Sequence, residues 1–182
     1  MDYDGYHPRL IGDIVGFSFD GNVHNTLAQI YFNTKDITPQ QYKESKTLTF
    51  KQIYGGIDKK NLHHEFFRKT QNFIDIIWEA FNKNGYIDVG SYRIKKDDHP
   101  KIHSQKLFNY YIQAFETEYN FTMLSRLFKL LEGKKSKVIL YVYDSVLIDF
   151  SLEDGKETLQ SIVTGKHCKI ILRLKCLNII VK

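Results

Sequence analysis

The chain has 182 residues, a mass of 21.5 kDa and a formal net charge of +5, which gives a slight preference for anionic partners. Its 42% hydrophobic and 26% charged residues are typical of a soluble globular protein and exclude wholesale disorder. No apolar run approaches the roughly 20 residues of a membrane span, so no membrane partner is expected. Cys168 and Cys176 are too few for a disulfide framework or a zinc site. Since the acidic N-terminus is also unlike a signal peptide, we expect a cytoplasmic protein.

Helical periodicity dominates the middle of the chain, and strand-like patterns gather near its C-terminus. Residues 9–19 fit either a short helix or the end of a strand. Helices are predicted at 23–32, 39–56, 61–83, 103–131 and 154–163. A small hairpin-like excursion is predicted at 85–96, and strands at 137–143, 146–150 and 169–181. Because helices and strands are segregated rather than alternating, the predicted fold class is α+β.

The first eight residues after Met1 contain an acidic residue and a basic residue at a suggestive spacing. Asp2 is followed by His7 five residues on and by Arg9 seven residues on. An aspartate leaving a strand with this spacing is a weak functional pattern when it is taken alone. The same composition is also common in a solvated N-terminus, so this segment alone leaves both readings open.

The helix predicted after Thr38-Pro39 carries one cation and two rings on one face. Lys46, Phe50 and Tyr54 are spaced i, i+4 and i+8, and Gly55 follows them. Such a stripe can hold a phosphate, a base and a template edge in order. The alternative is an amphipathic helix whose lysine extends its stem along apolar surface.

Tyr143-Asp144-Ser145 lies at the predicted turn between two apolar strands. A carboxylate held between such strands is a poor solubilising group and a good ligand for a divalent cation. Aspartate is also favoured by turn geometry itself, and that reading remains open for this motif taken alone.

Taken together, these motifs resemble the polymerase domain of family A DNA polymerases, the bacterial DNA polymerase I type. The resemblance runs from Asp2 nearly to the C-terminus and rests on five landmarks in the family's order. These are Asp2–Arg9 for motif A, Asn22–Ala28 for the helix start Asp-Ile-His-x-x-Thr-Ala, Thr38–Gly55 for motif B, Asn109 to Gln113 for Asn-x-x-x-Gln, and Tyr143-Asp144-Ser145 for motif C.

The resemblance implies a palm with a small antiparallel sheet and a set of helical fingers. It places the start of the palm in residues 1–20, the fingers in 21–100 and the rest of the palm in 101–182, with the motif C hairpin at 137–150. The family's thumb, its exonuclease domain and the strand that leads into motif A have no counterpart. We therefore expect the C-terminal part of a split or truncated polymerase, with a phage as the expected source and the host cytoplasm as its location.

The resemblance also implies a role for each matching residue. Two Mg²⁺ ions would be held by Asp2, Asp144 and the carbonyl of Tyr3, and Lys46 would neutralise the triphosphate of the incoming dNTP. Phe50 would pack on the nucleotide, while Tyr54 and Gly55 would close the pocket against the templating base. Primer-template DNA would be contacted by Arg9, Asn109, Gln113 and Tyr143.

Five departures from the family pattern qualify this picture. His7 replaces the glutamate that excludes ribonucleotides, Tyr42 replaces the arginine of motif B, and Gln105 occupies another basic position. In motif C, Tyr143 replaces the histidine and Ser145 replaces the second carboxylate. We expect weaker Mg²⁺ binding and weaker discrimination against ribonucleotides. Three hypotheses remain open. The chain is part of an active polymerase that an upstream fragment completes, a catalytically inactive DNA-binding remnant, or an unrelated α+β module.

Overall fold

The computed structural model describes residues 2–3, 5–142, 145–164 and 172–173, with the side chains of 2–3, 163–164 and 172–173 left undescribed. The chain divides into two compact units. A central unit comprises His7–Glu118, and a terminal unit comprises Met1–Tyr6 with Tyr119–Lys182. The domain boundaries predicted from the sequence, at 20/21 and 100/101, do not coincide with the boundaries of these two units. The assignment of the parts to palm and fingers remains a prediction.

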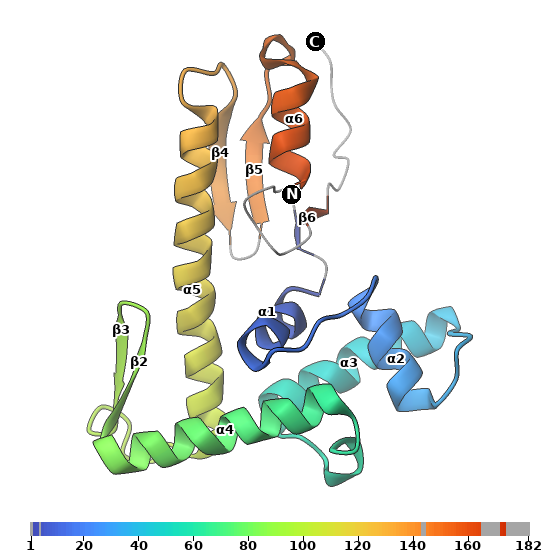
Figure 1. Ribbon diagram of the computed structural model, residues 1–182, viewed down its shortest axis with the longest axis vertical. Helices are drawn as coiled ribbons and strands as arrows, with labels where there is room; N and C mark the ends of the chain where they lie inside the picture. Colours follow the sequence, from blue (N-terminus) through green and yellow to red (C-terminus); the bar gives the residue numbers. More distant parts are fainter. Residues whose placement is uncertain (1, 4, 143–144, 165–171, 174–182) are drawn as a thin grey trace. The chain divides into compact units, whose positions relative to one another are not determined.

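The central unit is built mainly from helices, shown in blue to yellow-green in Figure 1. Its elements are α1 (Tyr6–Val15, from its second residue on), α2 (Val23–Phe32), α3 (Pro39–Gly55), the short 3₁₀ turn η1 (Lys59–Asn61), α4 (Glu65–Asn84), the hairpin β2 (Tyr86–Val89) and β3 (Tyr92–Lys95), and α5 (Ser104–Leu131) as far as Glu118.

Local sequence signals set the ends of these helices. The Thr38 hydroxyl accepts a hydrogen bond from the Gln41 amide, and the Gln41 side-chain oxygen accepts one from the Thr38 amide, which completes a capping box before Pro39. At its other end α3 stops at Gly56, whose φ of 114° is readily adopted only by glycine. The sequence predicted both ends of this helix, and the structure confirms them.

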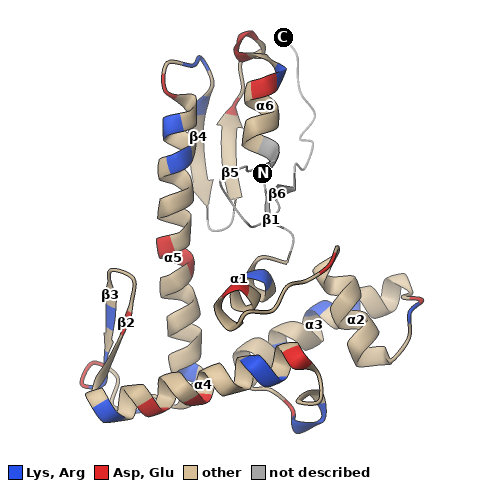
Figure 2. Ribbon diagram, in the orientation of Figure 1, with Lys and Arg blue, Asp and Glu red and all other residues tan. Residues whose placement is uncertain are grey.

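Two other predictions need correction. Residues 9–19 do not end a strand, because α1 already begins at Tyr6 and continues to Val15. The fourth helix begins at Glu65 rather than near Asn61, because η1 occupies the intervening turn and the His64 side chain caps the start of α4. Figure 2 shows charges of both signs along α4, so this helix offers no uniformly basic surface.

Aromatic rings fill much of the central core. Phe66, Phe67, Phe81 and Phe108 are completely or almost completely buried. Phe66 contacts Phe67 edge to face with ring centroids 5.2 Å apart. Packing in this core therefore explains part of the high aromatic content of the sequence.

The terminal unit contains a small antiparallel sheet in the order β4-β5-β1-β6. Its strands are β1 (Asp2–Tyr3), β4 (Lys137–Val142), β5 (Ser145–Asp149) and β6 (Leu172–Arg173). The remainder is the last part of α5, the turn η2 (Leu152–Asp154) and α6 (Gly155–Thr164). The predicted hairpin at 137–150 is thus present, while of the strand predicted at 169–181 only Leu172–Arg173 lies within the described residues.

Two polar contacts, of which the first is buried, hold the terminal unit together. The Tyr6 hydroxyl donates to Asn120 Oδ1 at 2.6 Å, and these residues are 5% and 2% exposed. Asp154 accepts from the backbone amides of Lys135 and Ser136 at 3.0 and 2.6 Å, which ties the start of β4 to the segment before α6. The side chain of Ser136, followed by the Lys135 and Ser136 amides, holds the pKa of Asp154 below its usual value by hydrogen bonding to the carboxylate.

Removing one partner from the Tyr6 contact is expected to destabilise the protein. Tyr6→Phe leaves the Asn120 amide buried with a lost partner, which costs about 1–3 kcal/mol. Urea denaturation followed by circular dichroism measures this, with Tyr92→Phe as the control because Tyr92 is 46% exposed. Equal stability of the two variants would show that the buried hydroxyl contributes nothing.

Candidate active site

The register of the terminal sheet brings the N-terminal motif beside the C-terminal hairpin. β1 lies between β5 and β6, and the Cα partners of Asp2 are Ser145 on one side and Arg173 on the other. Neighbouring strands lie about 4.8 Å apart. Residues 143 positions apart in sequence, Asp2 and Ser145, thus become neighbours, as the motif reading requires.

The predicted metal ligands are described only through this backbone arrangement. Tyr143 and Asp144 lie outside the described residues, and the side chains of Asp2 and Tyr3 are likewise not described. Among the side chains that are described, no group of three or more His, Cys, Asp or Glu residues could hold a metal ion. The assignment of Asp2, Tyr3 and Asp144 as metal ligands remains a prediction.

One face of α3 presents the predicted nucleotide-binding side chains. The rings of Phe50 and Tyr54 are stacked, with centroids 5.9 Å apart and an interplanar angle of 9°. Phe50 is 50% exposed, so part of this ring is available to a ligand. One turn earlier, Lys46 Nζ lies 4.6 Å from the centroid of the Tyr42 ring. The helical stripe predicted from the sequence is therefore present.

The opposite face of α3 is buried through polar rather than purely apolar side chains. Ser45 Oγ donates to the His24 carbonyl at 3.1 Å, and Thr49 Oγ1 donates to the Ser45 carbonyl at 2.7 Å. Both hydroxyls are almost fully buried. The Ser45 bond crosses to α2, and Thr49 Oγ1 also lies 3.2 Å from the hydroxyl of Tyr31 in α2. These two contacts between helices define the rotation of α3 about its axis and leave Phe50 half exposed.

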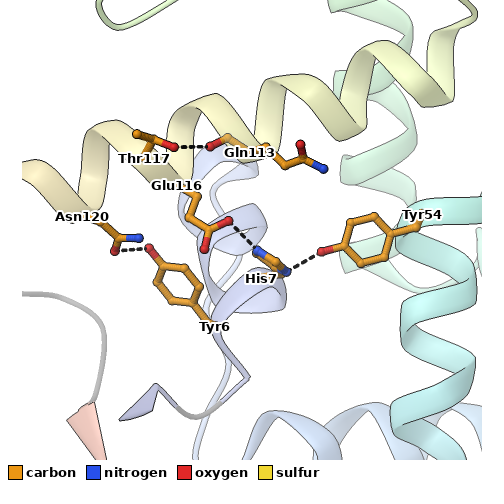
Figure 3. Close-up of polar contacts among 7 residues, drawn as sticks. All are labelled: Tyr6, His7, Tyr54, Gln113, Glu116, Thr117 and Asn120. Carbon is orange, nitrogen blue, oxygen red and sulfur yellow. Dashed lines mark hydrogen bonds and ion pairs between the residues drawn. The ribbon is translucent and has the colours of Figure 1, made fainter. Parts of the chain in front are cut away.

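Three polar side chains, those of Glu116, His7 and Tyr54, are linked by hydrogen bonds at the C-terminal end of this stripe (Figure 3). His7 Nε2 lies 2.9 Å from Glu116 Oε2, and His7 Nδ1 is hydrogen-bonded to the Tyr54 hydroxyl. The His7 and Glu116 side chains are 23% and 18% exposed. Burial, reinforced by the negative charge of Glu116, raises the pKa of Tyr54 to about 12. The phenol is therefore protonated at neutral pH.

The long helix α5 supplies amides to the last turn of α3. Asn109 Nδ2 donates to the Tyr54 carbonyl at 3.1 Å, and Gln105 Nε2 donates to the Ile53 carbonyl. The final carbonyls of a helix lack partners within the helix, so these amides satisfy groups that would otherwise need water. Asn109 thus has a structural partner inside the protein, and its predicted contact with DNA remains a prediction.

Gln113 differs from Asn109 in this respect. Its side chain is exposed, and among the described residues its amide has no hydrogen-bond partner, as Figure 3 illustrates. Only its backbone carbonyl is engaged, by Thr117 Oγ1 at 2.9 Å. Arg9 resembles Asn109 instead, because its guanidinium donates to the Gly21 carbonyl at 2.6 Å. Of Arg9, Asn109 and Gln113, the side chain of Gln113 is therefore the best placed to contact a ligand.

Glu116 is the residue that the sequence analysis did not identify. A signal for it was present, because Asn109, Gln113 and Glu116 follow one another at i, i+4 and i+7 along one helix. That spacing predicts a shared face, but the partner of Glu116 is His7, 109 residues away. Only the packing of α1 against α5 reveals the pair.

A separate cavity lies between α2, α3 and η1 in the central unit. It has a volume of about 240 Å³ and is lined by Ile30, Tyr31, Leu48, Gln52, Asp58, Lys60, Asn61 and His63. None of the predicted site residues lines it. Its polar lining suits water, and the predicted site is instead an exposed face.

Comparison with known proteins finds similarity at the level of structure. No protein-family model matches the sequence, and no curated protein matches it. The polymerase domain of Pol1 from M. smegmatis, solved in complex with DNA primer-template and dNTP, matches with a TM-score of 0.71 and 15% sequence identity. The match covers 89% of this chain and 35% of that chain, so the protein spans about a third of its neighbour. The chain thus has the fold of part of a polymerase domain.

No described helix is long and apolar enough to cross a membrane.

The raised pKa of Tyr54 predicts how stability depends on alkaline pH. An unfolded tyrosine ionises near pH 10 and folded Tyr54 near pH 12, so the unfolded state loses its proton first. The free energy of unfolding should therefore fall as the pH rises from 10 to 12, and fall less steeply in Tyr54→Phe. Urea denaturation across this range tests the slope. Tyr31→Phe is the matched comparison, because burial also raises the pKa of Tyr31 to about 12. An unchanged slope in Tyr54→Phe would contradict the prediction.

Proposed function

We propose that the chain carries out template-directed DNA polymerisation by nucleotidyl transfer, as part of a family A-like DNA polymerase. The observation that carries the proposal is the pairing of Asp2 with Ser145, because it joins the two segments that the motif reading assigns to one metal site. The fold likeness to a polymerase domain that binds primer-template and dNTP supports the same function independently. Primer-template DNA and dNTPs are accordingly the proposed partners.

The proposed metal site uses hard oxygen donors, which suit Mg²⁺. Asp2 and Asp144 would hold two ions through their carboxylates, and Tyr3 would add its carbonyl. Bound Mg²⁺ ions would promote ionisation of the primer 3′-hydroxyl and neutralise charge on the leaving pyrophosphate. The donor set is consistent with the backbone register, in which Asp2 neighbours the residue that follows Asp144.

The face of α3 is the proposed binding surface for the incoming dNTP. Lys46 forms no ion pair with a described carboxylate, so its charge is available to a triphosphate. Phe50 offers an exposed ring for packing on the sugar and base, and Tyr54 is held behind it by its stacking contact. His7 lies against Tyr54 and limits the space at the same end.

The strand β4 supports the further proposal that an upstream polymerase segment completes the protein. Ile139, Leu140, Tyr141 and Val142 are 36–57% exposed, although all are apolar or aromatic. β4 is also the first strand in the sheet order, with no described strand on its outer edge. An exposed apolar edge of this kind is suited to a protein partner.

Primer extension tests the proposed activity. The chain is incubated with primed template, dNTPs and Mg²⁺, both alone and mixed with the product of the reading frame immediately upstream. Extension should require the mixture and should be lost in Asp144→Ala by at least a factor on the order of 10³, because a two-metal site loses a ligand. Asp149→Ala is the control, since Asp149 is an exposed aspartate at the end of the same hairpin.

An inactive DNA-binding remnant is the second candidate function. Ser145, the partner of Asp2 in the sheet, lacks the carboxylate of the family's motif C, and Tyr42 replaces a motif B arginine. If the folded chain binds primed template but shows neither extension nor Mg²⁺-dependent dNTP binding, with or without the upstream product, the remnant is correct and the polymerase proposal is wrong.

Gly55 allows a second test of the dNTP-binding face. It lies in the last helical turn of α3, its φ is not positive, and a Cβ added there would meet nothing nearer than 4.0 Å. The fold itself therefore does not require glycine at this position. Gly55→Ala should leave stability unchanged or raise it by up to about 1 kcal/mol, since alanine favours helix.

The same substitution should lower primer extension on the order of tenfold, because a methyl group would obstruct the templating base. Extension rates and denaturation midpoints are measured on the same samples. Gln40→Ala is the matched control, as an exposed position in the first turn of α3. If Gly55→Ala extends primers as fast as the wild-type chain does, Gly55 is not part of the proposed site.

A further inference from the structure

Both ring nitrogens of His7 are hydrogen-bonded within the central unit. Nε2 faces a carboxylate oxygen of Glu116 at 2.9 Å, and Nδ1 faces the Tyr54 hydroxyl. A carboxylate can only accept, so the proton must lie on Nε2. In the neutral imidazole, Nδ1 then carries a lone pair and accepts from Tyr54. The position of Glu116 thus determines the His7 tautomer and, through it, the direction of the bond to Tyr54.

Tyr54 is held by α5 at both of its ends. Its carbonyl accepts from Asn109 Nδ2 at 3.1 Å, and its hydroxyl is linked to Glu116 through His7. Phe50 stacks on the ring between these two points. The His7 ring meets the Tyr54 ring edge on, with centroids 5.8 Å apart and an interplanar angle of 81°. The His7 ring in this arrangement cannot turn without breaking its hydrogen bonds to Glu116 and to Tyr54.

We infer that Glu116 is a positioning residue that locks the His7 ring against Tyr54 and thereby sets the preference of the α3 face for deoxyribonucleotides over ribonucleotides. This inference rests on the proposed function. The sequence alone predicts weaker discrimination, because His7 stands in place of a carboxylate. In the structure a carboxylate from a different helix lies directly behind the imidazole. A ring held at both nitrogens excludes a 2′-hydroxyl by its bulk, whereas a freely rotating ring would yield space to it.

The test compares Glu116→Ala with Glu116→Gln in the full chain. Alanine removes the acceptor for His7 Nε2–H, while the glutamine side chain keeps an oxygen at the same reach. Glu118→Ala is the matched control: it deletes a carboxylate two residues along α5 that accepts from the Ser91 amide at 2.5 Å. Thermal denaturation of all three variants verifies that each is folded.

Two readouts are taken from each protein. The first is the ¹⁵N spectrum of the His7 ring, assigned with His7→Phe, which reports the tautomer directly. The second is the ratio of affinities for dATP and ATP, measured by equilibrium binding with Mg²⁺ and primed template. A merely structural role for Glu116 would weaken both nucleotides equally and would leave that ratio unchanged.

The wild-type chain is expected to show the Nε2–H tautomer and to prefer dATP. Glu116→Ala should give a mixture of tautomers and lower the dATP/ATP ratio on the order of tenfold, while Glu116→Gln and Glu118→Ala retain both properties. An unchanged tautomer or an unchanged ratio in folded Glu116→Ala would overturn the inference. Absence of nucleotide binding in the wild-type chain, both alone and mixed with the product of the upstream reading frame, would instead overturn the proposed function, together with the selectivity that rests on it.

Discussion

The last turn of α3 is held by side chains of α5, and the candidate nucleotide-binding face depends on this arrangement. Asn109 and Gln105 satisfy the carbonyls of Tyr54 and Ile53, which a helix terminus leaves without partners of its own. Glu116 reaches the hydroxyl of the same tyrosine through His7. Because backbone and side chain are both restrained, the exposed rings keep one orientation. A ligand binding there need not pay the full cost of ordering them.

The two faces of α3 differ in residue composition because one packs inside the protein and the other is more exposed. The inner face uses short hydroxyl side chains, such as Ser45 and Thr49, whose hydrogen bonds to residues of α2 require one orientation of the helix. The outer face leaves Phe50 half exposed and gives Lys46 a ring rather than a carboxylate as its neighbour. This half-exposed ring and this cation are the features on which the proposed binding of a planar, anionic ligand rests.

Local signals in the sequence were sufficient for most of the secondary structure. The capping box at Thr38, the glycines after α3 and the spacing along α5 each act over a few residues, so they can be read directly. The start of α4 was misplaced because a 3₁₀ turn and a histidine cap lie within an otherwise helical pattern. The Lys46, Phe50 and Tyr54 stripe was also predictable, since helical spacing alone defines it. The metal ligands remain predictions, as their side chains lie outside the described structure.

By itself, the sequence determined the order of the elements, the α+β class and the exposed stripe, because these depend on periodicity and on caps within single segments. The tertiary structure decided which distant residues meet. It paired Asp2 with Ser145 across the sheet and brought Glu116 to His7 from another helix. Those contacts join positions more than 100 residues apart, and no local pattern encodes them. They arise only when the packed elements bring their backbones and side chains together.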